Sequence, residues 1–555
     1  MALTDELLMQ AGVATELLDG ETVERLRVSA RRERVPILSK VLAHYRIPVS
    51  ALHRAVAESR QIPFIDLTTA TIDRKLLKKL PGSLIKRKHF LPVQIDQNLM
   101  LVTADPDDMA GIAAATRLIG AELPIVMAEP KRLKLMVDNY LATSAMAVVE
   151  ENATAPLETD LVVLLDTILT EAYLTRASDV HLLTEEEGLR IRLRIDGSLS
   201  DYPLAADQSV ASGLVSRIKV LAGLDIAEQR QPQDGGFTYH LVAPFDLDFN
   251  IRVATAPTRL GERITMRLLG QESGGLTLTD LGMLEQDLAR FSQAIRNPYG
   301  MILLTGPTGS GKSTTLFAAL QEINKPDINI MTVENPIEYV IEGVSQIQTG
   351  PKISFADALR SLLRHDPDVL MVGEIRDAET ADVAVKAAMT GHLVFSTLHT
   401  NNAVSAVTRL IDIGCEPFLI GSTMTAVIAQ RLVRRLCRHC ASKRTATEAE
   451  RQALGYEDEI IEIFDPVGCA VCQGTGFRGR LGLFETLWFD EQLARMVAKG
   501  ADEETLEQAA GDKLRFMWQD GCEKVLRGMT TLEEIQKVAV VKHLSQSEVT
   551  YDAAV

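Results

Sequence analysis

The sequence contains no apolar run of the roughly 18–20 residues that a membrane-spanning helix needs. Its first residues, Met1–Gln10, carry acidic rather than basic side chains before their apolar stretch, so they do not resemble a signal peptide. These two absences predict a cytoplasmic protein. Any association with a membrane is then expected to be peripheral and made through a partner protein.

Basic residues and large aromatic residues are also in short supply. Lys and Arg number 58 against 75 Asp and Glu, and the formal net charge is −17. A nucleic-acid backbone favours a basic surface, and base stacking needs aromatic side chains, of which the chain has only 2 Trp and 9 Tyr. We therefore expect no direct binding of nucleic acid.

Cysteine is scarce too, because six cysteines in 555 residues do not suggest a disulfide framework. Two of them, Cys415 and Cys522, stand alone and are expected to be buried or partly buried thiols. The other four form two Cys-x-x-Cys pairs: Cys437, Cys440, Cys469 and Cys472. Four thiolates in two such pairs predict a closed tetrahedral Zn²⁺ site that organises the fold. A redox dithiol is the alternative, although a single pair would be enough for it.

The length of the chain predicts several domains, since a single core does not extend over 555 residues. Apolar residues follow a helical spacing at first and then alternate between short apolar runs and helical stretches. Strand-like segments follow, among them Leu189–Ile195, which alternates apolar and charged residues and ends at Asp196 and Gly197, a hairpin signal. We predict an N-terminal domain (1–140), a linker (141–159), an α+β domain (160–270), a hinge (271–284) and a C-terminal domain (285–555).

A phosphate-binding loop is the most specific motif in the sequence. An apolar strand, Met301–Thr305, leads into Gly306-Pro-Thr-Gly-Ser-Gly-Lys-Ser, and a helix-forming stretch follows. Glycines let backbone N–H groups surround a phosphate, Lys312 can reach the β- and γ-phosphates, and Ser313 can bind Mg²⁺. We therefore predict binding of ATP with Mg²⁺ by the following residues: Gly306, Pro307, Thr308, Gly309, Ser310, Gly311, Lys312, Ser313 and Thr314.

Three further apolar strands end in polar residues that suit nucleotide hydrolysis. They are Ile330–Glu334, which continues as Asn335-Pro-Ile-Glu-Tyr, Asp368–Glu374, and Leu393–Thr397, which is flanked by His392 and His399. In a parallel sheet, the carboxyl ends of such strands meet at the edge that carries the phosphate loop. Acids at that edge can hold Mg²⁺ or polarise a water, and a histidine can sense a γ-phosphate.

Together, the phosphate-binding loop and these three strand-end motifs resemble those of the secretion ATPases of type II secretion systems and type IV pilus assembly. The resemblance extends from about Asp160 to the C-terminus. The resemblance implies a multi-domain α/β fold. Its parts would be a RecA-like P-loop ATPase core, an α+β, PAS-like second domain, and a helical plus α/β N-terminal region. It also places the tetracysteine module in the ATPase domain, at about residues 430–482.

The resemblance further implies roles for single residues. Glu338 is expected to be the general base, Glu374 the magnesium-associated acid, and His399 part of the histidine box. The family usually has Asp where this chain has Asn335, so no carboxylate role is expected there.

Arginines are also implied to act on the nucleotide. Arg252 and Arg267 stand where the family places such residues, and a guanidinium near a γ-phosphate offsets charge in the transition state. Arg360 and Arg364 are further candidates, which could equally form structural ion pairs.

The branch of the family is suggested by Gly311–Phe317 and Ala403–Leu410, which look more like type II secretion than pilus assembly. The resemblance implies a hexamer whose N-terminal domain docks to the cytoplasmic domain of an inner-membrane platform protein. Related N-terminal domains can instead bind a cyclic dinucleotide, for which no clear motif is present. Less favoured alternatives are a DNA-translocating motor and a nucleotide-gated scaffold.

Overall fold

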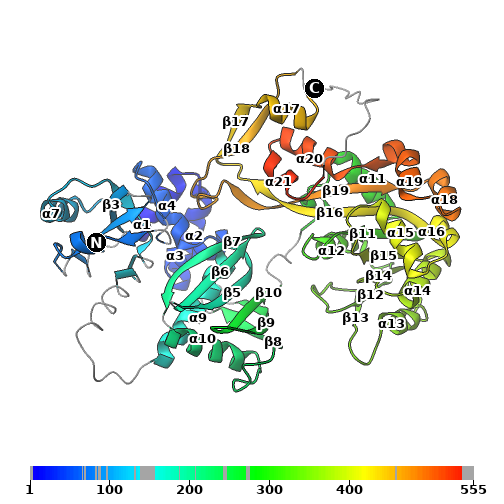
Figure 1. Ribbon diagram of the computed structural model, residues 1–555, viewed down its shortest axis with the longest axis horizontal. Coiled ribbons are helices and arrows are strands. Elements are labelled where there is room, and N and C mark those ends of the chain that lie inside the picture. The colour runs from blue at the N-terminus through cyan, green and yellow to red at the C-terminus, as the bar shows by residue number, and fades with distance from the viewer. Residues whose placement is uncertain are drawn as a thin grey trace. The chain divides into compact units, whose positions relative to one another are not determined.

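The computed structural model describes residues 4–137 and 157–540 (Figure 1), except for positions 66, 68–69, 82–83, 86–88, 96–97, 131–132, 135, 187, 207, 242–246, 270–275 and 457–458. The chain divides into two compact units. Unit 1 contains Met1–Gln271, Cys437–Cys440 and Val467–Arg478, and unit 2 contains Glu272–Leu436, Ala441–Pro466 and Gly479–Val555. Most of the predicted linker, and residues 271–275 of the predicted hinge, lie outside the described residues.

Unit 1 begins with a group of helices, and a small sheet follows. The helices are α1 (Asp5–Ala14), α2 (Gly20–Glu33), α3 (Ile37–Tyr45) and α4 (Val49–Ser59). Their apolar faces form one core, in which Met9, Val41 and Leu52 are almost fully buried. The sheet has the order β1-β2-β3-β4. Its elements are β1 (Thr71–Ile72), α5 (Arg74–Leu77), β2 (Leu91–Ile95), β3 (Asn98–Thr103), α7 (Met109–Ile119) and β4 (Ile125–Met127).

A six-stranded antiparallel sheet makes up the rest of the continuous part of unit 1, in the order β7-β6-β5-β10-β9-β8. Its elements are α9 (Leu157–Leu174), β5 (Ala177–Glu185), β6 (Gly188–Ile195), β7 (Ser198–Ala206), α10 (Gln208–Leu221), β8 (Gln233–Leu241), β9 (Leu247–Thr258) and β10 (Gly261–Leu268). Apolar residues of α9 and α10 share a core with one face of this sheet, so its other face carries the polar residues of each strand.

The hairpin signal at Asp196 and Gly197 is a turn between β6 and β7. Both residues have positive φ, 48° and 87°, which suits the right-handed twist of a two-residue hairpin. Helix α9 begins at Leu157, a few residues before the predicted start of the second domain.

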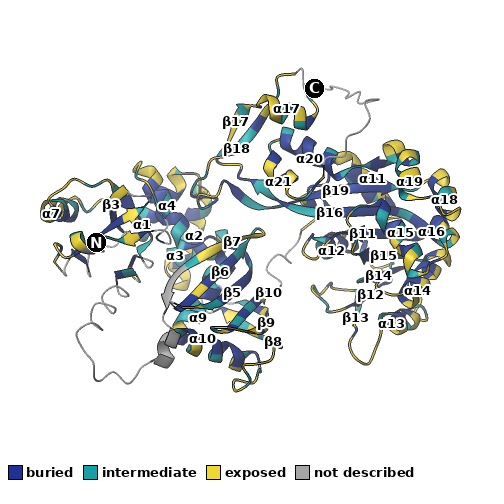
Figure 2. Ribbon diagram, viewed as in Figure 1, coloured by how far each residue is buried: buried dark blue, intermediate teal, exposed yellow. Residues whose placement is uncertain are grey.

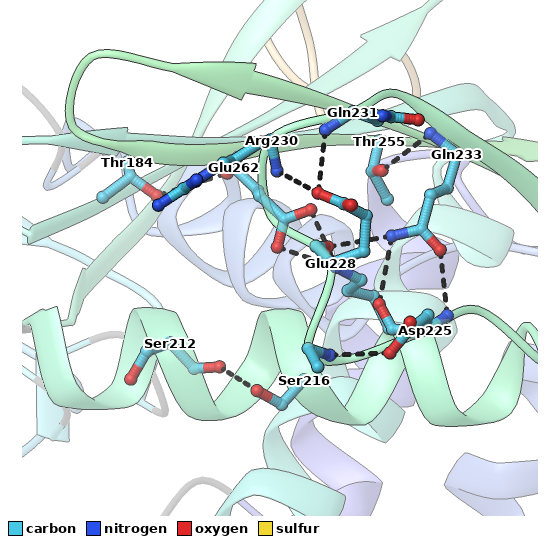
Figure 3. A network of polar contacts seen from close by, with 12 residues as sticks. Thr184, Ser212, Ser216, Asp225, Glu228, Arg230, Gln231, Gln233, Thr255 and Glu262 are labelled. Carbon is cyan, nitrogen blue, oxygen red and sulfur yellow. Dashed lines mark hydrogen bonds and ion pairs between the residues drawn. The ribbon is translucent and has the colours of Figure 1, made fainter.

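A polar network fixes the segment between α10 and β8 (Figure 3). Lys219 on α10 is fully buried, and its Nζ donates to Glu262 Oε1 at 2.9 Å, to Glu262 Oε2 at 3.0 Å and to the Glu228 carbonyl at 2.6 Å. Gln233 Nε2 donates to the same carbonyl and to that of Asp225, each at 3.0 Å. The buried charge of Lys219 therefore has a full set of acceptors, as a charge in an apolar core requires.

Unit 2 is built on an eight-stranded sheet with the order β13-β12-β14-β15-β11-β16-β19-β20. Its strands are β11 (Gly300–Thr305), β12 (Ile330–Glu334), β13 (Ser345–Gln348), β14 (Val369–Val372), β15 (Leu393–Leu398), β16 (Met424–Leu436), β19 (Phe477–Trp488) and β20 (Leu514–Arg515). The strands from β13 to β16 in this order run parallel. Strands β11, β12, β14 and β15 are buried along their whole length (Figure 2), because cores form on both faces of the sheet.

Helices cover both faces of this sheet, and a small two-stranded sheet is attached to the unit. The helices are α11 (Glu285–Ala294), α12 (Lys312–Ile323), α13 (Phe355–Leu362), α14 (Ala378–Met389), α15 (Val404–Ile413), α16 (Pro417–Thr423), α18 (Glu491–Ala498), α19 (Glu503–Ala510), α20 (Met517–Leu526) and α21 (Leu532–Gln536), with 3₁₀ turns η2 (Leu278–Leu281) and η3 (Gly511–Lys513). Strands β17 (Ala441–Thr445) and β18 (Glu462–Pro466) flank α17 (Glu448–Leu454), and all three lie in the segment between the two cysteine pairs.

The predicted fold class is confirmed. The chain is mixed α/β, with a helical N-terminal region and several sheets. In the part of the chain that the structure describes, no helix is both long and apolar enough to cross a membrane.

Candidate functional site

The phosphate-binding loop lies between β11 and α12, as the sequence predicts. Gly306, Gly309 and Gly311 have φ of 143°, 78° and 89°, a region that only glycine adopts readily. A Cβ on Gly306 would lie 2.5 Å from the Gln430 carbonyl oxygen, and one on Gly311 would lie 2.8 Å from Gln430 Nε2. The loop therefore curls tightly against β16. The first N–H groups of α12 point out of the helix and are available to an anion.

Two buried polar groups in this loop suit a phosphate. Lys312 is 8% exposed, and its Nζ donates to the carbonyls of Gly306 at 2.6 Å and Pro307 at 3.1 Å. Burial lowers the pKa of Lys312 to about 8. Ser310 Oγ is buried and has no hydrogen-bond partner among the described residues. A bound phosphate would supply the missing acceptor and a counter-charge for the lysine, so the residues present fit MgATP.

The predicted acids gather at the same edge of the sheet. Glu374 follows β14, and its carboxylate contacts His399 Nε2 at 3.3 Å and Arg376 Nη2 at 2.6 Å. Glu338 follows β12. Both carboxylates act on the charge of Lys312, since Glu374 and Glu338 each raise its pKa against the larger effect of burial. The parallel order β12-β14-β15-β11 thus brings Lys312, Glu338, Glu374 and His399 together, although their catalytic roles remain predictions.

The two histidines that flank β15 lie at opposite ends of the strand. His392 lies at the start of the strand, where its Nδ1 is 2.9 Å from the Ala387 carbonyl oxygen. It is therefore at the amino edge, away from the phosphate loop, whereas His399 lies at the carboxyl edge.

Arg431 is a residue of this edge that the sequence did not assign to the nucleotide site. In β16, Ala429 pairs with Thr305, the last residue of β11, so Arg431 extends beyond the start of the phosphate loop. Its Nη2 donates to Asn401 Oδ1 at 3.1 Å, and its charge helps to lower the pKa of Lys312. Arg434, three residues later, instead pairs with Glu534 at 2.7 Å. Arg431 is placed at this edge by the parallel pairing of β11 with β16, and no sequence motif predicts that pairing.

The arginines proposed to contact nucleotide have different surroundings. Arg252 and Arg267 are direct neighbours in the β9–β10 pairing, on the polar face of the sheet of unit 1. Arg267 Nε donates to Asp179 Oδ1 at 2.9 Å. In unit 2, Arg360 forms an ion pair with Glu379 at 2.8 Å, which is the structural alternative considered above. Action of any of them on nucleotide remains a prediction.

The four cysteines of the two pairs converge, with all four Sγ atoms within 4.8 Å of one another. Three of the Sγ–Sγ distances are 3.7–3.8 Å. A tetrahedral zinc with Zn–S bonds of about 2.3 Å requires an S–S distance of about 3.8 Å, so the cluster fits Zn²⁺. Backbone N–H groups of Gly468 and Gly476 point at the sulfurs of Cys440 and Cys472, each at 3.2 Å, and such contacts stabilise thiolates.

The surroundings of this cluster were not anticipated. Cys437, Ala470, Val471 and Cys472 share a core with the N-terminal helices, and the pKa of Glu58 on α4 is raised by burial beside them. Both cysteine pairs therefore belong to unit 1 in their packing, although they come from the C-terminal half of the chain.

Comparison with known proteins agrees with the motifs. The family described as Type II/IV secretion system protein matches residues 153–537, which is more than half of the chain. This chain belongs to that family. A second family, the MshEN domain, matches residues 60–147. The resemblance inferred from the sequence is confirmed, and the protein is an ATPase of the secretion and pilus class.

Individual relatives cover most of the chain. It is 49% identical to type II secretion system protein E of Aeromonas hydrophila over 380 residues, which are 68% of this chain and 75% of that one. It is 37% identical to the type IV pilus assembly ATPase PilB of Myxococcus xanthus over 519 residues, 88% of this chain and 91% of that one. Among solved structures, the ATPase DotB of Legionella pneumophila is similar in fold, with a TM-score of 0.51, 23% identity, and coverage of 70% of this chain and 97% of that one.

Proposed function

We propose that this secretion ATPase hydrolyses ATP in the cytoplasm as a hexamer and drives pseudopilus assembly in a type II secretion system. The observation that carries the proposal is the convergence of Lys312, Glu338 and Glu374 at one sheet edge, in a chain that is 49% identical to a type II secretion system protein E. The N-terminal domain would dock the ring to the cytoplasmic domain of an inner-membrane platform protein.

In the proposed mechanism, the phosphate loop binds the β- and γ-phosphates through its N–H groups and Lys312. Ser313 and Glu374 would hold Mg²⁺, which neutralises charge on these phosphates when bound. Glu338 orients a water and accepts its proton while the water oxygen bonds to the γ-phosphorus and the bond to the bridging oxygen breaks. Arg252 and Arg267 offset the charge of the transition state, and His399, hydrogen-bonded to Glu374, responds to the loss of the γ-phosphate.

The first experiment compares ATP hydrolysis by the wild type, Lys312→Ala and Glu338→Gln, each sized by light scattering. The proposal expects turnover concentrated in a hexameric fraction, loss of ATP binding in Lys312→Ala, and binding without cleavage in Glu338→Gln. A wild type that binds ATP but never cleaves it, even as a hexamer with the platform domain, would instead be a nucleotide-gated scaffold. Stimulation of turnover by DNA would favour a DNA motor.

Pilus assembly is the second candidate, because the PilB relative covers 88% of the chain. The two candidates separate in two hosts, one lacking its type II secretion ATPase and one lacking its pilus assembly ATPase. Restored secretion of a reporter exoprotein supports the first candidate, and restored surface pili support the second.

We also propose that the cysteine cluster binds structural Zn²⁺. The S–S distances support this assignment over a redox dithiol, because four sulfurs rather than two converge. Metal analysis of the purified chain tests it.

A further inference from the structure

The segment Asn335–Ile341, which carries Glu338, is held by side chains of the two strands that it connects. Gln346 of β13 donates from Nε2 to the Tyr339 carbonyl at 2.9 Å and accepts at Oε1 from the Ile341 N–H at 2.9 Å. Gln348 accepts at Oε1 from the Ile337 N–H at 3.2 Å. The backbone on both sides of Glu338 is therefore fixed.

Glu334 lies at the centre of this arrangement. It is the last residue of β12 and is 4% exposed. Its Oε1 accepts from Thr332 Oγ1 at 2.6 Å and from Gln346 Nε2 at 2.9 Å. The backbone N–H of Glu338 also acts on this carboxyl group, because it lowers the pKa of Glu334 against the larger effect of burial. A single buried carboxyl group thus links β12 to Gln346 of β13, and Gln346 in turn holds the backbone of Tyr339 and Ile341 next to the residue proposed as the base.

The same segment is anchored to the nucleotide-binding helix. The ring of Tyr339 meets that of Phe317 on α12 edge-on, with centroids 4.8 Å apart. Ile341 is 6% exposed in the same core, whereas Val340 between them is 89% exposed. The segment therefore alternates between anchored residues and exposed residues, and Glu338 is among the exposed ones, where its charge acts on Lys312 of the phosphate loop.

The geometry points to Glu334 as a positioning residue that, together with Gln346, places the Glu338 carboxylate for hydrolysis. This inference rests on the proposed role of Glu338. Burial raises the pKa of Glu334, which favours the neutral acid. Because a glutamine side chain has the shape of that neutral acid, its Oε1 can take the place of Glu334 Oε1 and accept from both Thr332 and Gln346. Placement of the Glu338 carboxylate should therefore depend on the hydrogen bonds of residue 334 and not on its charge.

The test uses the full chain and measures kcat and KM for MgATP in Glu334→Gln, Glu334→Ala, Glu338→Gln and the double variant Glu334→Ala/Glu338→Gln. Glu334→Ala should lower kcat by about 100-fold with KM unchanged, as expected for a catalytic group displaced by about 1 Å. Glu334→Gln should stay within about tenfold of the wild type, because its hydrogen bonds are retained. In the Glu338→Gln background, the residual cleavage is followed in single-turnover experiments with excess enzyme, and Glu334→Ala should lower that residual rate no further, since it acts only through Glu338.

A matched control removes side-chain hydrogen bonds from the other end of the same strand. Asn329 precedes β12, and its Nδ2 donates to the carbonyls of His365 at 3.0 Å and Asp366 at 2.8 Å. Asn329→Ala should reduce thermal stability but leave kcat unchanged.

Three results would overturn the inference. Glu334→Gln as inactive as Glu338→Gln would show that the carboxylate of Glu334 itself takes part in the chemistry. A normal kcat in Glu334→Ala, or an additive loss in the double variant, would show that Glu334 does not act through Glu338. If the wild type itself failed to hydrolyse ATP in every assembly state, the proposed function would fail instead.

Discussion

The buried pair Lys219–Glu262 gives a quantitative prediction for the sheet of unit 1. The side chains are 1% and 6% exposed, so Lys219→Met would leave a carboxylate in the core without its cation. Removing one partner of such a pair costs about 3–5 kcal/mol. The Glu228 carbonyl keeps a hydrogen bond from Gln233 Nε2 at 3.0 Å, so the loss should come mainly from Glu262.

Amide hydrogen exchange of β5 and β10 peptides measures this effect locally, which suits a multi-domain chain that does not unfold in one step. Protection in Lys219→Met should fall by roughly two to three and a half decades, because each 1.4 kcal/mol corresponds to about a tenfold change. The double variant Lys219→Met/Glu262→Leu should recover most of the loss, since neither charge is then buried.

The matched control is the pair Arg259–Glu186, which joins the β9–β10 and β5–β6 turns of the same sheet at 2.9 Å but has side chains 79% and 74% exposed. Arg259→Met should change protection by no more than about 1 kcal/mol, as expected for an exposed pair. The reasoning would be refuted if Lys219→Met and Arg259→Met had equal effects, or if the double variant were no better than Lys219→Met alone.

Three further predictions concern the two sites. A bound phosphate should raise the pKa of Lys312 from about 8, so MgATP binding near pH 8.5 should take up protons, and the affinity should fall as pH rises. Calorimetry in buffers of different ionisation enthalpy should show this proton uptake in the wild type and no uptake in Lys312→Arg. Gly306→Ala should abolish binding of a fluorescent ATP analogue while far-UV circular dichroism stays normal, because its Cβ would lie 2.5 Å from the Gln430 carbonyl oxygen. Cys472→Ser should lose zinc by elemental analysis and reduce exchange protection of α4, whereas Cys415→Ser, at an isolated buried thiol, should keep both.

The phosphate loop could be predicted from sequence because its information is local. The positive φ values of Gly306, Gly309 and Gly311 and the reach of Lys312 are set within a few residues, and the flanking strand and helix show in the apolar pattern. The turn at Asp196 and Gly197 could be predicted for the same reason. The multi-domain α/β class came from the family resemblance that these motifs carry.

Features that depend on strand order or on distant packing could not be predicted in this way. Arg431 reaches the phosphate loop only because β16 pairs in parallel with β11, more than a hundred residues earlier. The core that Cys472 shares with the helices α1–α4 joins segments that are far apart in the sequence. The spacing of apolar residues within either segment does not predict this contact. Family resemblance supplied the roles of Arg252 and Arg267, and these roles stay predictions.

The two glutamates after Val333, Glu334 and Glu338, show why the sequence pattern alone does not say which acid is the general base. Both stand at the carboxyl end of a strand, so the pattern allows either to be the base. The difference lies in their surroundings, because Glu334 is buried and accepts hydrogen bonds from Thr332 and Gln346, whereas Glu338 is exposed. A carboxyl group that is 4% exposed, and whose Oε1 already accepts two hydrogen bonds, has little access to a water. It is well suited to hold its neighbour in place, so the burial of one acid supports the assignment of the other as the base.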